Sequence, residues 1–132
     1  MLANAQRFIS ATPYSDIPFD EQSMEDAFVL MMECGLCIID VDAEGNHLGG
    51  AGAIKGPLYF NNNVQIAMER FWWVVPDERA KGVGKALYQA LESSAKDAGC
   101  THLMMIGLDN EVYQLYERLG FKKTEEVFIK RL

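Results

Sequence analysis

The fold of this chain is decided by the stretch VVPDERAKGVG, residues 74–84. An apolar run, 64–75, leads into it and is typical of a buried strand, and a helical pattern begins near Val83. Gly82 and Gly84 allow the backbone to come close to a ligand, and the first turn of a helix leaves amide N–H groups without partners inside the helix. Since phosphate groups bind at such helix starts, the stretch predicts a site for a phosphorylated ligand.

The charge around this turn favours an anionic ligand. Arg79, Lys81 and Lys85 place three of the 12 basic residues close together, in a chain whose formal net charge is −7. The acidic balance of the whole chain disfavours non-specific binding to the phosphates of nucleic acid. We therefore expect a small phosphorylated ligand at the turn and no nucleic-acid partner.

Two common phosphate-binding motifs do not match the turn. A Walker A loop requires glycine at position 79 and serine or threonine at position 86, where Arg79 and Ala86 stand. A dinucleotide-binding fingerprint requires glycine at position 87 and an acidic residue near 104, where Leu87 and Met104 stand. Walker-type nucleotide hydrolysis and nicotinamide or flavin binding are therefore excluded. Another nucleotide at this turn stays open as a third hypothesis.

The elements around the turn alternate between strand and helix. We predict a strand at 64–75, a helix from Val83 that Gly99 ends, a strand at 101–108, a helix at 110–119 and a last strand at 121–132. Upstream we predict a short helix at 2–9, a loop at 10–20, a helix that begins at the capping-box pattern 23–26 and ends at Gly35, and a hairpin of 36–41 with 47–60. The helix between 64–75 and 101–108 returns the chain to the same end of the sheet, so a right-handed strand–helix–strand crossover makes these two strands parallel. The predicted fold class is α/β, a mixed sheet with helices on both faces.

Length and composition fit a single domain over residues 1–132. The 132 residues are 49% hydrophobic, and they contain neither an apolar run long enough for a membrane span nor a secretory leader, so we expect a cytoplasmic protein without a membrane partner. Cys34 and Cys37 form a C-x-x-C motif. The pair of a thioredoxin-like redox motif lies where a strand leads into a helix, whereas this pair lies where a helical pattern ends and a strand begins. No second C-x-x-C pair is present to complete a zinc site. We expect small buried thiols and no metal.

Two motifs resemble the signatures of one enzyme family. The stretch 74–84 resembles the V-x-P-x-x-R-x-x-G-x-G signature of the GCN5-related N-acetyltransferases (GNAT), and LYERLGF, residues 115–121, resembles their second signature, L-Y-x-x-x-G-F. Both motifs lie within 64–132, in the order and spacing of the family. The resemblance implies a GNAT-like mixed sheet whose parallel central strands splay apart. The chain is also similar to small acetyltransferase-like proteins encoded by bacteriophages, which would place it in the cytoplasm of a host cell.

The resemblance implies acetyl-CoA as the cofactor. In the family, backbone amides of the Gly-rich turn hold the pyrophosphate, and the end of the preceding strand binds the pantetheine arm. A backbone amide of that strand, here near Val74, stabilises the oxyanion. Carried onto this sequence, the cofactor-binding residues are Trp72, Trp73, Val74, Val75, Arg79, Ala80, Lys81, Gly82, Val83, Gly84 and Lys85.

The resemblance also suggests two catalytic side chains. Tyr116 matches the phenol that serves the family as general acid, although a tyrosine packed with Val112 and Leu119 would show the same spacing. Glu69 lies among apolar residues, one position out of step with the glutamate that acts as base in histone-modifying members. A β-bulge could restore its direction, and a structural ion pair is the alternative role for this carboxylate.

The predicted function is transfer of an acetyl group from acetyl-CoA to a primary amine by direct attack. The acceptor, a small-molecule amine or a protein amine, would be covered by the loop 10–20 and the helix after it. The alternative is a weakly active or inactive GNAT-like fold that acts by binding a protein partner. The sequence leaves open both the identity of the acceptor and the oligomeric state, a homodimer included.

Overall fold

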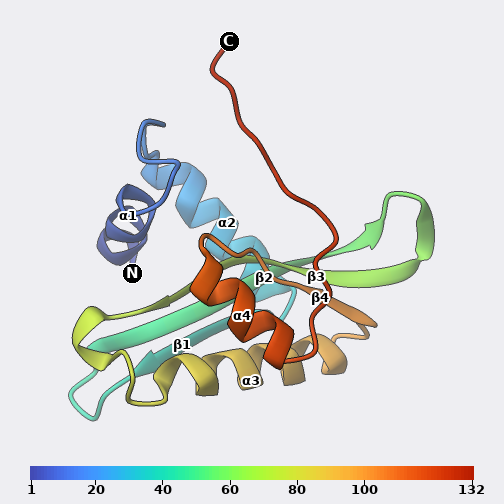
Figure 1. The fold of residues 1–132 in the computed structure, drawn as a ribbon. Coiled ribbons are helices and arrows are strands. Elements are labelled where there is room, and N and C mark those ends of the chain that lie inside the picture. The colour runs from blue at the N-terminus through green and yellow to red at the C-terminus, as the bar shows by residue number, and fades with distance from the viewer.

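The computed structural model describes all residues from 1 to 132 (Figure 1). Its elements are, in chain order, α1 (Leu2–Ser10), α2 (Glu21–Glu33), β1 (Cys37–Val41), β2 (His47–Leu58), β3 (Asn61–Val74), the 3-10 helix η1 (Pro76–Glu78), α3 (Val83–Asp97), β4 (His102–Met104) and α4 (Asn110–Arg118). The strands form one sheet in the order β1-β2-β3-β4, antiparallel except for the parallel pair of β3 and β4. The predicted α/β fold with a mixed sheet is confirmed.

None of the helices combines the length and the apolar character that crossing a lipid bilayer requires.

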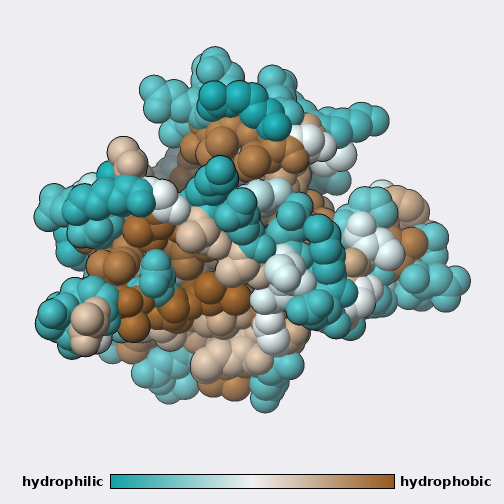
Figure 2. Space-filling model, turned by 90° about the horizontal axis from the view of Figure 1, so that it is seen from below, coloured by the Kyte–Doolittle hydropathy of each residue, from teal (hydrophilic) through white to brown (hydrophobic).

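Helices cover both faces of the sheet. On one face, α3 presents Leu87, Leu91 and Ala95, which recur every four residues and meet Ala51 and Ala53 of β2 in the main core. On the opposite face lie α1 and α2, above the sheet in Figure 1. Only 17 residues are buried, and apolar side chains reach the surface among polar ones on the face seen from below, where α3 lies (Figure 2). The fold therefore keeps part of its apolar surface accessible.

Glycines in β2 make room for an aromatic ring of β3. A Cβ atom at Gly52 would lie 2.4 Å from Cε1 of Phe71 and 2.6 Å from Sδ of Met31, too close for any side chain. Phe71 occupies this space and meets Phe28 of α2 edge-on, with the ring centroids 5.5 Å apart. The glycines in this strand therefore mark a close approach of the backbone to these side chains, which lets α2 pack against the sheet.

The two parallel strands part after three residue pairs. Residues 66–68 of β3 pair with residues 102–104 of β4, and no further pair follows. On the other edge of β3, Phe71 and Glu69 lie opposite consecutive residues of β2, so Arg70 is the extra residue of a β-bulge. The splayed parallel strands are thus confirmed, and a bulge lies beside Glu69.

Several predicted element boundaries are wrong; β3, for example, begins at Asn61 rather than at residue 64. Helix α2 begins after Asp20, whose carboxylate accepts a hydrogen bond from the Ser23 amide (2.8 Å), so Asp20 is the N-cap and the capping-box pattern at 23–26 is not. The strand predicted over 101–108 is paired only within β4, because both backbone groups of Ile106 bond to side chains instead of to a neighbouring strand. By contrast, Asp109 caps α4 through the Val112 amide, as its sequence position indicates.

The predicted last strand, 121–132, is also wrong. The Phe121 amide donates to the Tyr116 carbonyl (2.9 Å), and the Phe121 ring packs on Tyr88. From residue 122 onward the backbone makes no hydrogen bond to other backbone groups, and the chain extends away from the sheet (Figure 1). The apolar residues 127–129 have the composition of a strand, but they pair with none and stay exposed.

The three cysteines are free thiols that are half-buried rather than fully buried: Cys34, Cys37 and Cys100. Cys34 and Cys100 pack against the main core, as expected of small apolar side chains. Burial raises the pKa of the Cys37 and Cys100 thiols. Because the thiolate is the reactive form, these side chains are poor nucleophiles at neutral pH.

Candidate active site

The turn between β3 and α3 presents a row of unpaired amides. The backbone takes a positive φ at Ala80 (67°) and at Gly82 (88°), and Gly82 is the N-cap of α3. The amides of residues 82–85 donate to no backbone or side-chain acceptor. Such a row at the positive end of a 15-residue helix suits an anion such as a phosphate. The sequence located this turn, and the structure shows that its donors are free.

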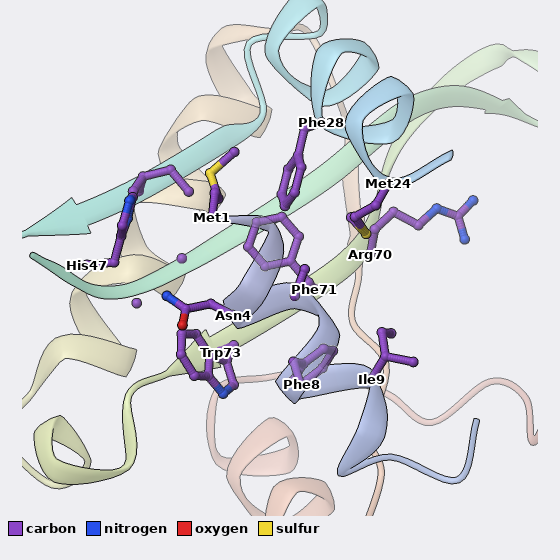
Figure 3. Close-up of a pocket in the computed structure, with 14 residues that line it drawn as sticks. Met1, Asn4, Phe8, Ile9, Met24, Phe28, His47, Arg70, Phe71 and Trp73 are labelled. Carbon is purple, nitrogen blue, oxygen red and sulfur yellow. The ribbon is translucent and has the colours of Figure 1, made fainter. Parts of the chain in front are cut away.

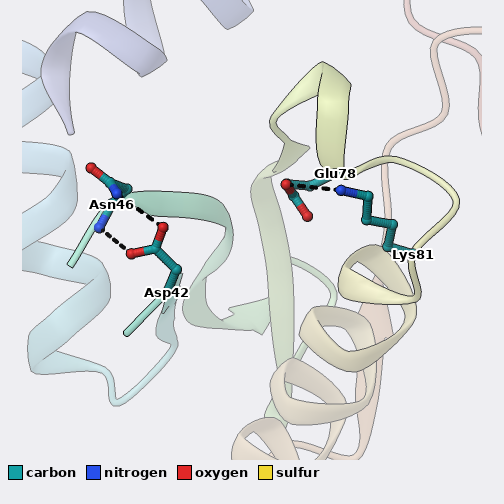
Figure 4. Close-up of polar contacts among 4 residues, drawn as sticks. All are labelled: Asp42, Asn46, Glu78 and Lys81. Atoms are coloured by element: carbon teal, nitrogen blue, oxygen red, sulfur yellow. Dashed lines mark hydrogen bonds and ion pairs between the residues drawn. The ribbon is translucent and has the colours of Figure 1, made fainter. Parts of the chain in front are cut away.

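Two of the three basic side chains at this turn already have partners within the chain. Arg79 donates from Nε to the Val74 carbonyl (3.3 Å), and Lys81 pairs with Glu78 (3.2 Å; Figure 4). Contacts of this exposed kind contribute little to stability, so an anion can replace them. Lys85 is exposed and forms no ion pair. The predicted basic cluster is therefore present, with Lys85 as its free cation.

Trp72 links the end of β3 to the first turn of α3 by a hydrogen bond. Its indole Nε1 donates to the Gly84 carbonyl (3.1 Å), and its ring stacks on Tyr116 with centroids 6.1 Å apart. The next residue, Trp73, lines a cavity beneath α1 instead. The Val75 amide donates to a carbonyl of β2 (2.9 Å) and is not free. The residues predicted to bind the cofactor along β3 therefore have different surroundings, and only some of them can face one ligand.

The two predicted catalytic side chains meet at the backbone of one residue. Glu69 is 5% exposed, and its Oε2 accepts a hydrogen bond from the Ile106 amide (2.9 Å). Tyr116 is 8% exposed, and its phenol donates to the Ile106 carbonyl (2.8 Å). No basic side chain pairs with Glu69, so the structural ion pair considered for it is wrong. Ile106 itself carries no sequence signal, because its role depends only on its backbone.

Burial gives this pair the protonation states of a base and an acid. It raises the pKa of Glu69 to about 7, although the hydrogen bond from Ile106 and the charge of Arg70 both act to lower it. Burial also raises the pKa of Tyr116 above its ordinary value, and the charges of Glu69 and Asp109 raise it further. Near neutral pH, Glu69 can therefore take up a proton while Tyr116 keeps its own.

A cavity of about 80 Å³ lies on the other face of β3, beneath α1 (Figure 3). Phe8 of α1, Phe28 of α2, and Phe71 and Trp73 of β3 line it. Of the two segments predicted to cover the acceptor, the loop 10–20 contributes no lining residue, whereas the helix after it contributes Met24 and Phe28. The alternation of Phe71 and Trp73 along the strand could have indicated an aromatic face, but nothing in the sequence shows that α1 folds over it.

Comparisons with known proteins bear on the family and the fold of this chain. The family model described as the acetyltransferase (GNAT) family matches residues 2–121. The chain is 28% identical over 134 residues to an aminoglycoside N(6')-acetyltransferase type 1 from Stenotrophomonas maltophilia, with 97% of this chain and 84% of that protein covered. A putative acetyltransferase from Pyrococcus furiosus has a TM-score of 0.72 at 22% identity, covering 98% of this chain and 93% of that one. An aminoglycoside N-acetyltransferase solved in complex with CoA has a TM-score of 0.63 at 23% identity, covering 84% of this chain and 86% of that one.

The resemblance to phage-encoded proteins stays a prediction. Since the family model spans nearly the whole chain, the chain belongs to the acetyltransferase (GNAT) family.

Proposed function

We propose that this protein transfers an acetyl group from acetyl-CoA to a primary amine by direct attack, with Glu69 as general base and Tyr116 as general acid. The observation that carries the proposal is the placement of both side chains on the backbone of Ile106, where β3 and β4 part. A base and an acid whose pKa values lie apart, held side by side, suit a reaction that removes one proton and supplies another.

The chain has the features that the cofactor needs. The four free amides at 82–85 would hold the pyrophosphate, with Lys85 as the nearby free cation and Arg79 and Lys81 as cations that can exchange their present partners. Beyond Met68, no strand pairs with the edge of β3 that faces β4, so backbone groups there can bind a pantetheine arm. When bound, acetyl-CoA would supply an already activated acetyl thioester.

The chain's own groups would then manage two protons. Glu69 takes a proton from the acceptor amine, whose free pKa is about 10.4 if it is a lysine-type amine. Tyr116 holds its proton on the phenol oxygen, directed at the Ile106 carbonyl, and delivers it to a leaving thiolate by rotating the O–H bond. A backbone amide near Val74 serves as the oxyanion donor. No step requires a cysteine nucleophile, which agrees with the raised pKa of the Cys37 and Cys100 thiols.

Calorimetry and a thiol-release assay test the proposal together. Coenzyme A and acetyl-CoA should each bind with measurable heat, and a panel of small amines, polyamines and protein lysines should include an acceptor that releases free thiol. Tyr116→Phe should slow this release by about 10²–10⁴-fold without weakening CoA binding. The matched control is Tyr113→Phe, a half-exposed tyrosine on the same helix.

Each failure has its own meaning. No heat with either form of the cofactor would overturn the proposal. Cofactor binding without thiol release from any amine would favour the alternative, a fold that acts by binding a protein partner. Equal rates for the wild type and Tyr116→Phe would remove Tyr116 from the mechanism.

A further inference from the structure

We infer that the acceptor is a monoamine with a small aromatic or apolar body, and that the body binds in the cavity beneath α1. The inference rests on the proposed function, which it extends by naming the acceptor's chemical class. It starts from the residues that line this cavity on the face of the sheet opposite α3 (Figure 3).

The lining of the cavity is aromatic and carries no negative charge. Phe8, Phe28, Phe71 and Trp73 supply rings, and no aspartate or glutamate is among the lining residues. The one formally charged lining side chain is Arg70, which is exposed and has no ion-pair partner. A body with several ammonium groups would lose hydration here, gain no carboxylate partner and be repelled by Arg70. An aromatic or aliphatic group gains ring contacts instead.

The size of the cavity points the same way. Pockets that enclose drug-sized ligands have volumes of about 300–1,000 Å³. A cavity of about 80 Å³ can enclose a single ring or a branched aliphatic group, and the rest of a larger ligand would lie outside it.

The cavity and the Glu69 side chain belong to opposite faces of β3. Phe71 follows Glu69 by two residues, which is about 7 Å along an extended strand. Glu69 lies opposite Ala53, which packs in the core under α3, so the Glu69 side chain starts from the face opposite the cavity, and the unpaired edge of β3 beyond Met68 lies between them. An amine joined to a ring by a chain of a few bonds would meet the Glu69 carboxylate across this unpaired edge while its ring contacts Phe71.

The formal charge of the whole chain would suggest a different acceptor. A net charge of −7 attracts cations from a distance, and by that measure alone a polyamine would be favoured. Long-range charge affects the rate of encounter, whereas the groups that line the site decide which ligand stays. The charge that bears on acceptor choice is thus the local one, set by Arg70 and the uncharged rings.

The test compares acceptors of the two classes on the same protein. With acetyl-CoA saturating, 2-phenylethylamine should release thiol with a kcat/KM at least tenfold above that of spermidine or an aminoglycoside. Phe8→Ala should raise the KM for 2-phenylethylamine about tenfold and leave kcat nearly unchanged, because it removes a ring contact and no reacting group. The matched control is Phe60→Ala, which alters an exposed ring outside the cavity.

A second variant tests the charge at the cavity. Arg70→Glu should raise the kcat/KM for spermidine relative to 2-phenylethylamine. Because the charge of Arg70 lowers the pKa of Glu69, both proteins are assayed well above that pKa. A preference for spermidine or the aminoglycoside in the wild type, or an unchanged KM in Phe8→Ala, would overturn the inference.

Binding without turnover separates this inference from the proposed function. Titration of 2-phenylethylamine should quench the tryptophan fluorescence of Trp72→Phe, in which Trp73 is the remaining tryptophan, and the quenching should weaken when Phe8→Ala is added. If no amine is acetylated but this quenching is seen, the proposed function fails and the cavity still binds aromatic amines. If amines are acetylated and 2-phenylethylamine neither reacts nor quenches, the inference fails alone.

Discussion

The carboxylate of Glu69 accepts a hydrogen bond of 2.9 Å from the backbone amide of Ile106, 37 residues further along the chain. This bond spans the gap that opens where β3 and β4 part. The Ile106 carbonyl accepts the phenol of Tyr116, so one peptide segment positions both candidate catalytic groups. A change that moves Ile106 would therefore alter both groups together.

The stability of the protein should depend on the protonation of Glu69. Its folded pKa is raised to about 7 from an ordinary value of 4.5, so the folded state holds this proton more tightly than the unfolded state. The resulting stabilisation is fully present below about pH 4.5 and is lost as the pH rises to about 7. Between these limits the wild type should lose about 3 kcal/mol relative to Glu69→Gln. Urea unfolding of both proteins across this range measures the difference, and a gap that is independent of pH would contradict the assignment.

The pH dependence of activity should report the same group. A general base acts in its deprotonated form, so kcat/KM should rise with pH through a midpoint of about 7 and then level off. Glu69→Gln should lose this rising limb and fall about 10²–10⁴-fold in activity. Glu117→Gln, an exposed change on α4, serves as the control and should keep the limb. A wild-type profile with no inflection near neutral pH would remove Glu69 as the base.

Trp72→Phe should disturb the cofactor turn. The change removes the hydrogen bond from the indole to the Gly84 carbonyl, which positions the first turn of α3. We expect a loss of about 1 kcal/mol in the free energy of unfolding and a several-fold weaker affinity for CoA. Chemical denaturation and calorimetry measure the two effects. Tyr59→Phe, at an almost fully exposed ring, should change neither, and unaltered CoA affinity in Trp72→Phe would show that this bond does not support the turn.

Lys85→Gln should weaken CoA binding about three- to tenfold, because it removes the free cation beside the unpaired amides. The difference from the wild type should shrink as salt is added, since the side chain is exposed and its charge is screened. Lys96→Gln is the matched control, because Lys96 lies in the last turn of the same helix. Equal effects of the two substitutions would mean that overall charge, rather than the turn, attracts the cofactor.

The segment after α4 divides into an anchored residue and a free tail. Deleting residues 125–132 should change the free energy of unfolding by less than about 0.5 kcal/mol, because their backbone makes no hydrogen bond within the fold. Phe121→Ala should cost about 2 kcal/mol, because its ring packs on Tyr88 and Tyr116. Thermal and urea unfolding distinguish the two. A large loss on deletion would show that the tail packs against the fold in solution.

The parts of the site that were predictable from sequence are those encoded by near neighbours. The turn 74–84, the end of α3 at Gly99 and the cap of α4 at Asp109 each depend on a helix period, a glycine φ or a side chain three residues from its partner. Two neighbouring residues, Asp20 and Ser23, could each cap the start of α2. The sequence pattern favoured Ser23, but Asp20, one turn earlier, is the N-cap in the structure.

Tertiary contacts alone decided the rest. The hydrogen bonds to Ile106 join residues 37 and 10 positions away, and they replaced the strand pairing that the composition of 101–108 favours. The same holds for the cavity beneath α1 and for the unpaired tail after Phe121. A helix or a turn is stabilised by atoms a few residues apart, so its pattern is visible in the chain. The surroundings of a buried carboxyl, a cavity or a strand edge are formed by segments far apart in the sequence. These features therefore become visible only in the packed structure.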